Sequence, residues 1–78
     1  MSELLEEMKN AILKAIPGAE VVVNGSGGHF VIDVTSEQFA NKRILQQHRM
    51  VLSAIAYLMK GENAPVHAID KLNCHLPS

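Results

Sequence analysis

The stretch GSGGHFVIDV, from Gly25 to Val34, decides the fold because a glycine-rich turn runs directly into an alternating strand. Asparagine and glycine tolerate positive φ, so Asn24 to Gly28 is expected to form a flexible turn. Side chains alternate between the two faces of a strand, so the strand His29–Thr35 should have one apolar face and one mixed face. The apolar face carries Phe30, Ile32 and Val34, and the mixed face carries His29, Val31, Asp33 and Thr35.

The residues before this turn predict a helix and a partner strand. Ser2 is the expected cap of a first helix, which Pro17 and Gly18 end. The segment AEVVVNG, residues 19–25, is rich in β-branched residues and predicts a strand, so the two strands flanking the turn form a hairpin. The apolar stripe of the first helix has helical spacing and consists of Leu4, Leu5, Met8, Ile12 and Leu13.

The residues after the hairpin predict two more helices. Ser36 is the expected cap of a brief helix, EQFA, at residues 37–40, and Asn41 is expected to break it. A long helix is expected at roughly 43–60, with Gly61 as its C-terminal cap. The expected buried stripe of this long helix consists of Ile44, Val51, Leu52, Ile55, Leu58 and Met59.

The segment VHAIDKLNCHL, residues 66–76, predicts the last strand. Its Ile69 and Leu72 lie three positions apart, which predicts a bulge or an early end of the strand. A strand that returns through helices to the same sheet is expected to lie parallel to the strand it left. The order α-β-β-α-α-β therefore predicts one α+β domain over residues 1–78, with a three-stranded mixed sheet and helices on one face. The other face is expected to be open or to meet a partner.

Composition narrows the function classes. The 78 residues carry a net charge of −1, with 47% hydrophobic and 19% charged residues, as in a folded protein. This charge gives no general attraction to nucleic acid or acidic membrane, and no apolar run reaches the roughly 18 residues that span a bilayer. The single cysteine, Cys74, excludes an internal disulfide and fits a reducing compartment, so a cytoplasmic location is expected. We interpret Cys74 first as a small buried hydrophobe, second as a ligand and last as a redox thiol.

Two histidines are the candidate metal ligands. His29 and His67 each begin one of two strands that are expected to be parallel neighbours, so both should lie at the same edge of the sheet. A strand spacing of about 5 Å would bring the two imidazoles within reach of one metal site. Two nitrogen ligands are too few for a metal site, because zinc takes three or four protein ligands. The alternative is that both histidines are surface or hydrogen-bonding residues. His48 is expected to pack or cap its helix, and His75 to lie in a frayed tail.

Several separated motifs resemble the BolA family. The segment GHFVIDVTSEQFANKRILQQHRMV, residues 28–51, and VHAID, residues 66–70, resemble that family's motifs and occur in the same order. They include a His-Phe pair after a small residue, a Ser-x-x-Phe motif, a basic pair, a His-Arg-Met segment and a His-Ala pair. The resemblance covers roughly Val21 to Leu72 and implies a fold like that of the type II KH domain.

The resemblance also implies a partner and a cofactor. BolA-like proteins bind monothiol glutaredoxins of the Cys-Gly-Phe-Ser type, and the two proteins hold a bridging [2Fe-2S] cluster with glutathione. The resemblance assigns the principal ligand of this chain to His67. Many relatives carry a second ligand in a longer hairpin loop, but the loop NGSGG has neither histidine nor cysteine, so His29 is the nearest candidate. The isolated chain is expected to hold no cluster and to be a monomer or weak dimer.

Two other function classes are weighed against this one. An enzyme is not expected, because the chain has no nucleophile with a base at motif spacing and no paired carboxylates. DNA binding is the serious alternative, because residues 36–60 resemble a helix-turn-helix. The same basic residues could instead be solvated or could meet glutathione or an acidic glutaredoxin face. The candidate DNA contacts are Lys42, Arg43, Gln46, Gln47 and Arg49.

Overall fold

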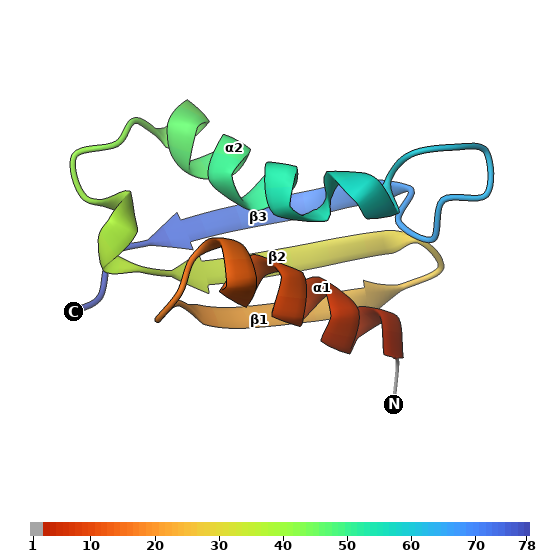
Figure 1. The fold of residues 1–78 in the computed structure, drawn as a ribbon, viewed down its shortest axis with the longest axis horizontal. Coiled ribbons are helices and arrows are strands. Elements are labelled where there is room, and N and C mark those ends of the chain that lie inside the picture. Colours follow the sequence, from red (N-terminus) through yellow and green to blue (C-terminus); the bar gives the residue numbers. More distant parts are fainter. Residues whose placement is uncertain (1–2) are drawn as a thin grey trace.

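Three strands form one mixed sheet in the order β1-β2-β3 (Figure 1). The computed structural model describes residues 3–78, so the expected cap Ser2 lies outside the described residues. Strand β1 pairs antiparallel with β2, and β3 pairs parallel with β2, as the sequence predicted. The elements in chain order are α1 (Glu3–Ala15), β1 (Glu20–Ser26), β2 (His29–Thr35), η1 (Glu37–Phe39), α2 (Ile44–Ile55), η2 (Ala56–Leu58) and β3 (Ala68–His75).

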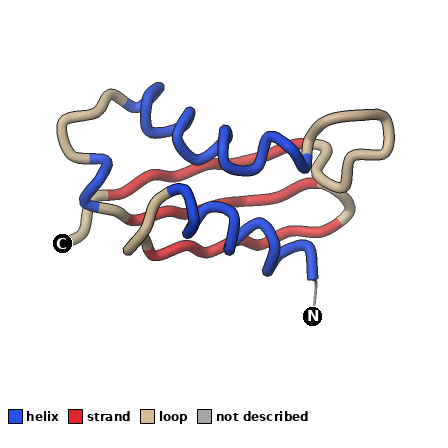
Figure 2. Tube along the Cα trace, in the orientation of Figure 1, coloured by secondary structure: helices blue, strands red, loops and turns tan. Residues whose placement is uncertain are grey.

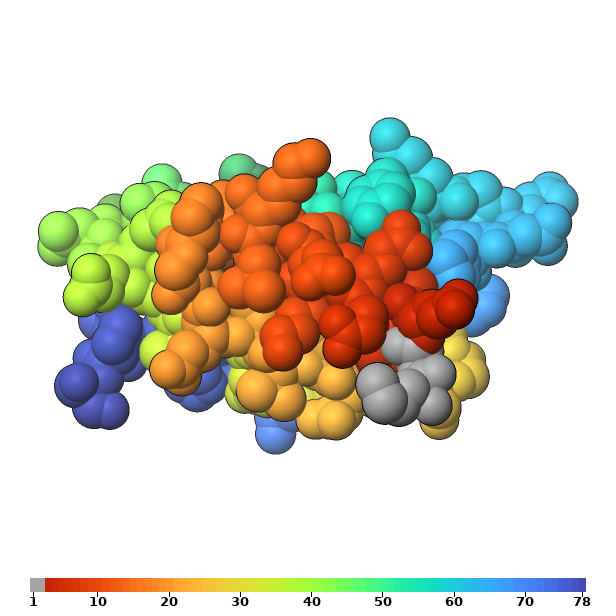
Figure 3. All heavy atoms as spheres, turned by 60° about the horizontal axis from the view of Figure 1, so that its bottom comes forward, coloured from red at the N-terminus to blue at the C-terminus, as the bar shows by residue number. Residues whose placement is uncertain are grey.

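The two α-helices lie on the same face of the sheet (Figure 2). Their buried side chains meet those of β2, where burial alternates as the sequence predicted. Figure 3 shows α1, in red and orange, across the front of the molecule, with α2, in green and cyan, behind it. The opposite sheet face has no helix over it, so its side chains are exposed or half-buried. The core consists of Met8, Ile12, Ile16, Ala19, Val21, Phe30, Ile32, Val34, Phe39, Val51, Ile55, Leu58 and Val66.

Strand β3 contains the bulge that the spacing of its apolar residues predicted. Phe30 pairs with Ile69, and the next residue, Val31, pairs with Lys71. Asp70 is therefore the extra residue of the bulge. The bulge restores the alternation, so that Leu72 and Cys74 pack against the core on the helix side.

The hairpin turn is shorter than expected. Pairing of β1 with β2 continues to Ser26 and His29, which leaves only Gly27 and Gly28 in the turn. Both glycines have positive φ, 64° and 84°, as the favoured two-residue hairpin turn requires. The expected turn at residues 24–28 was wrong because Asn24 and Ser26 are exposed strand residues. Their polarity reflects contact with water rather than a break in pairing.

The connection from β2 to α2 agrees with the sequence. The Ser36 hydroxyl accepts a hydrogen bond of 3.0 Å from the Gln38 backbone N–H at the start of η1. Asn41 follows with φ of 64°, a left-handed conformation that asparagine tolerates.

Helix α2 departs from its expected bounds and stripe. It begins at Ile44 and ends at Ile55, and the tighter η2 turn follows. Gly61 does not cap a helix but begins a turn, where its carbonyl accepts from the Ala64 N–H at 3.4 Å. Ile44 was expected to be buried but is 70% exposed. Its helical phase is right, but the N-terminal end of α2 lies beyond the edge strand β3 in the view of Figure 1, whereas the later turns lie across that strand.

The two ends of this stripe provide a matched test. Ile55 is fully buried in the core and Ile44 is not. We expect Ile55→Ala to lower the free energy of unfolding by about 2–5 kcal/mol, because it leaves a cavity. Ile44→Ala should change it by no more than about 0.5 kcal/mol. Urea unfolding followed by circular dichroism measures both, and equal losses would contradict the assigned packing of α2.

Candidate functional site

The hairpin turn and the start of β3 meet at one end of the sheet. The Gly28 carbonyl accepts two backbone hydrogen bonds, from the His67 N–H at 2.8 Å and from the Ala68 N–H at 3.0 Å. His29 pairs with Ala68, so the structure brings positions 29 and 67 to the same end of neighbouring parallel strands. This is the placement that the sequence predicted for the two candidate ligands.

His67 stands just before β3 rather than opening it. The preceding residue, Val66, is buried, and its N–H donates to the Leu58 carbonyl at 3.2 Å. His67 itself is exposed, and its ring makes no hydrogen bond or ion pair within residues 3–78. Among the described residues, therefore, neither ring nitrogen is used by the fold.

The His67 ring lies against the α-carbon of Gly28. A Cβ added to Gly28 would overlap the ring atom Cδ2 and would lie 2.8 Å from Cγ. Only a residue without a side chain leaves this space to the imidazole.

His29 has a partner on the open face of the sheet. Its Nδ1 lies 3.0 Å from the Asp70 Oδ1, and both side chains are more than half exposed. A carboxylate on one ring nitrogen is the usual arrangement behind a metal-binding histidine, because it fixes the tautomer and leaves Nε2 outward. Asp70 owes its place to the β3 bulge, and its role could not be read from the sequence, since 41 positions separate it from His29.

The ligand set at this end is incomplete. No hydrogen bond joins the His29 and His67 rings, and residues 3–78 contain no group of three or more His, Cys, Asp or Glu side chains suited to a metal ion. A [2Fe-2S] cluster therefore fits this end only as a shared group, for which a partner supplies the remaining ligands. The ligand roles of His29 and His67 stay predictions.

The other end of the sheet holds Cys74 and His75. Cys74 pairs with Val34 and is half-buried against the core. The expectation that His75 lies in a frayed tail was wrong. His75 ends β3, its carbonyl accepts from the Ser36 N–H at 3.0 Å, and its Nε2 lies 3.3 Å from the Asp33 Oδ1. These contacts hold the last strand residue in place, at the end away from His67.

Burial raises the pKa of the Cys74 thiol. Iodoacetamide reacts with the thiolate, so alkylation at pH 8 should be slower in the folded chain than in the urea-unfolded chain. The pH profile of the folded chain should also lie at higher pH. The buried neutral thiol stabilises the fold below the unfolded-state pKa, and this contribution is lost as pH rises through the folded-state pKa. Equal rates for the folded and unfolded chains would contradict this burial.

The five candidate DNA contacts are not equivalent. The Gln47 side-chain amide donates to the Phe39 carbonyl at 3.1 Å and to the Lys42 carbonyl at 3.0 Å, so it fastens the loop before α2. The Gln46 Oε1 accepts from the Arg43 N–H at 3.2 Å. The side chains of Lys42, Arg43 and Arg49 are exposed. The element before the turn, η1, has three residues, which is a single turn rather than the full first helix of a helix-turn-helix.

Lys42 and Arg43 lie at the other end of the sheet from His29 and His67. The loop before α2 stands at the end of the molecule where β2 finishes, whereas the hairpin turn and His67 stand at the opposite end (Figure 1). A partner bound at one end would leave the other end open.

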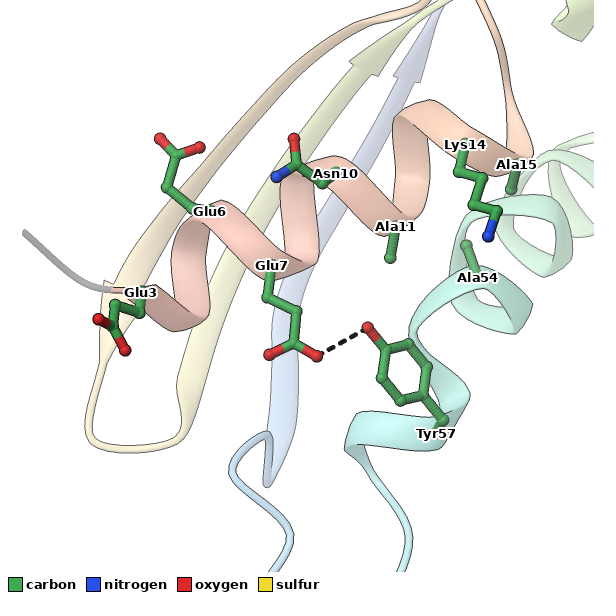
Figure 4. Close-up of a pocket in the computed structure, with 9 residues that line it drawn as sticks. All are labelled: Glu3, Glu6, Glu7, Asn10, Ala11, Lys14, Ala15, Ala54 and Tyr57. Atoms are coloured by element: carbon green, nitrogen blue, oxygen red, sulfur yellow. Dashed lines mark hydrogen bonds between the residues drawn. The ribbon is translucent and has the colours of Figure 1, made fainter.

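A groove of about 770 Å³ between α1 and the α2–η2 segment was not predicted from the sequence (Figure 4). Ala11, Ala15 and Ala54 leave space between the helices. Glu7 and Tyr57 point toward each other across it, and the Tyr57 hydroxyl donates to the Glu7 Oε2 at 2.9 Å. This hydrogen bond is the main cause of a raised pKa at Tyr57. No histidine or cysteine is among the described residues that line the groove, so it offers a metal ion neither imidazole nor thiolate.

Comparison with known proteins identifies the family. The family model for BolA-like proteins matches residues 4–75. The chain belongs to the BolA-like family. It is 38% identical over 56 residues to the protein BOLA2 of Arabidopsis thaliana, a match that covers 72% of this chain and 56% of that protein. It is also 32% identical over 65 residues to an uncharacterized protein in the rpoN-murA intergenic region of Acinetobacter guillouiae, covering 82% of this chain and 75% of that protein.

Solved BolA-like structures share the fold. BolA1 from Arabidopsis thaliana superimposes with a TM-score of 0.80 at 17% identity, covering 99% of this chain and 95% of that one. A bol-like protein from Babesia bovis gives 0.71 at 26% identity, covering 94% and 84%. The family and the α+β fold predicted from the sequence are thus confirmed, whereas the likeness to type II KH domains stays a prediction. No helix within residues 3–78 is long and apolar enough to cross a membrane.

Proposed function

We propose that this BolA-like chain binds a monothiol glutaredoxin of the Cys-Gly-Phe-Ser type and helps to hold a bridging [2Fe-2S] cluster for iron-sulfur trafficking or iron sensing. The observation that carries the proposal is the state of His67. Its imidazole is exposed, has no partner within residues 3–78, and stands on a backbone held by two hydrogen bonds to Gly28. The described residues use neither ring nitrogen, so the imidazole is accessible to a ligand that a partner brings.

His67 would be the principal ligand and His29 an auxiliary one. The Asp70 carboxylate at the His29 Nδ1 favours the tautomer whose Nε2 can bind a metal. Histidine in place of cysteine at one iron of a [2Fe-2S] cluster raises its reduction potential, which suits a group that is passed on or that reports iron status.

The partner would supply the thiolates. The chain's single cysteine, Cys74, lies at the other end of the sheet and packs against the core. A thiolate-bearing partner that approaches the hairpin end would complete the ligand set. This division explains why the isolated chain is expected to hold no cluster.

DNA binding as a transcriptional regulator is the weaker proposal. Lys42, Arg43 and Arg49 are exposed and could contact phosphates, but the net charge is −1 and η1 is too short to serve as a helix. Weak binding that falls steeply with salt would fit these three residues. A footprint on a defined sequence at physiological salt would favour this alternative.

The test of the cluster proposal mixes the chain with a monothiol glutaredoxin, glutathione, iron and sulfide under anaerobic conditions. The visible spectrum of the mixed complex should differ from that of the glutaredoxin alone. His67→Ala should shift it toward that of an all-thiolate cluster and shorten the cluster lifetime, because nitrogen ligation is lost.

His75→Ala is the matched control, because it removes an exposed histidine from the other end of the sheet. It should leave the spectrum unchanged. His29→Ala should have a smaller effect of the same kind as His67→Ala. An unchanged spectrum and lifetime with His67→Ala, in a chain shown to be folded by circular dichroism, would refute the proposal.

A further inference from the structure

We infer that Gly28 is a positioning residue for His67. The imidazole lies in the space that is left because residue 28 has no side chain. The ring occupies the space that a Cβ of residue 28 would take, with overlap at Cδ2 and a separation of 2.8 Å at Cγ. The inference about ring position stands on this geometry alone. Its consequence for the cluster rests on the function proposed above.

If residue 28 gained a side chain, the His67 ring would have to move, because hydrogen bonds hold the backbone around His67 in place. The N–H groups of His67 and Ala68 both donate to the Gly28 carbonyl. Val66, one residue earlier, is buried and bonded to the Leu58 carbonyl. A side chain at position 28 could displace the backbone of residues 66–68 only if those hydrogen bonds were broken. It would instead turn the imidazole away into solvent, because His67 is exposed.

The same turn contains a glycine that separates backbone strain from the steric effect. Gly27 has φ of 64° and Gly28 has φ of 84°, so an L-residue is strained at either position. A Cβ on Gly27 would meet nothing within 4 Å, whereas a Cβ on Gly28 would meet the His67 ring. Both Gly27→Ala and Gly28→Ala therefore strain the backbone, but only Gly28→Ala places a methyl group against the His67 ring.

The functional consequence is preorganisation. A ligand whose direction is fixed before the partner arrives loses less side-chain freedom on binding. Changing a residue that orients a metal ligand typically lowers metal affinity about 10–100-fold. Gly28→Ala should therefore weaken the mixed complex although every ligand atom is still present.

The first experiment uses the isolated chain and NMR. The wild-type chain should show a strong NOE between the Gly28 Hα protons and the His67 Hδ2. Gly27→Ala should keep this NOE. Gly28→Ala should lose it, while the NOE from the residue 28 Hα to the His67 amide proton persists and shows that the backbone has not moved. Absence of the ring NOE in the wild type, or its survival in Gly28→Ala, would overturn the inference, whatever the mixed complex does.

The second experiment uses the mixed glutaredoxin complex and measures the cluster half-life. Gly28→Ala should shorten it about tenfold or more, in the range typical of orienting residues, and Gly27→Ala should leave it near the wild-type value. In a His67→Ala background, adding Gly28→Ala should have no larger effect than adding Gly27→Ala, because the ring is gone and the backbone strain of a residue with positive φ is what remains.

The two claims fail in different ways. If the wild-type chain forms no mixed complex, the proposed function is wrong and the NMR comparison still decides the inference. If His67→Ala alters the complex but Gly28→Ala behaves like Gly27→Ala, the ligand is right and the positioning role is wrong. If Gly28→Ala shortens the cluster half-life as much in the His67→Ala background as in the wild-type background, Gly28 serves only the fold and the inference is again wrong.

Discussion

The parallel pairing of β2 with β3 is the interaction on which the rest of the structure depends. Strand β2 is the central strand, so it must find a partner on each side, and its apolar side chains form the middle of the core. The neighbour β1 is close in sequence, whereas β3 returns to the sheet only after η1, α2 and η2. The contact of Gly28 with both His67 and Ala68 fixes where that return begins. Fold and candidate site therefore share one set of hydrogen bonds.

Local patterns predicted the parts of this structure that local chemistry controls. The alternation in β2 gave the buried face of the sheet, and the irregular spacing of Ile69 and Leu72 gave the bulge. The exposure of Ile44 could not be predicted, because helical phase gives the direction of a side chain but not whether a sheet lies beneath it. The contacts of His29 with Asp70 and of His67 with Gly28 join residues about 40 positions apart, so they depend on strand register.

The molecule has two chemically distinct ends. The hairpin end carries exposed histidines with no thiol beside them, and the opposite end carries the half-buried Cys74 and the basic loop before α2. A cysteine beside His29 and His67 would let the chain assemble more of a metal site alone. Because Cys74 lies at the other end of the sheet, a metal group bound at His29 and His67 would need its sulfur ligands from a partner.

The short hairpin turn leaves a strand residue, His29, as the one that could act as a second ligand in place of a loop residue. A two-residue turn leaves no mobile segment, so any side chain that serves near the turn must come from a strand. His29 is the first residue of β2, and the bulge places Asp70 against its Nδ1. A ligand of this kind is held by the sheet and by a carboxylate, whereas a loop ligand must be ordered when the partner binds. The entropy lost on binding would then be smaller, and the reach of His29 would be set by strand geometry rather than by loop length.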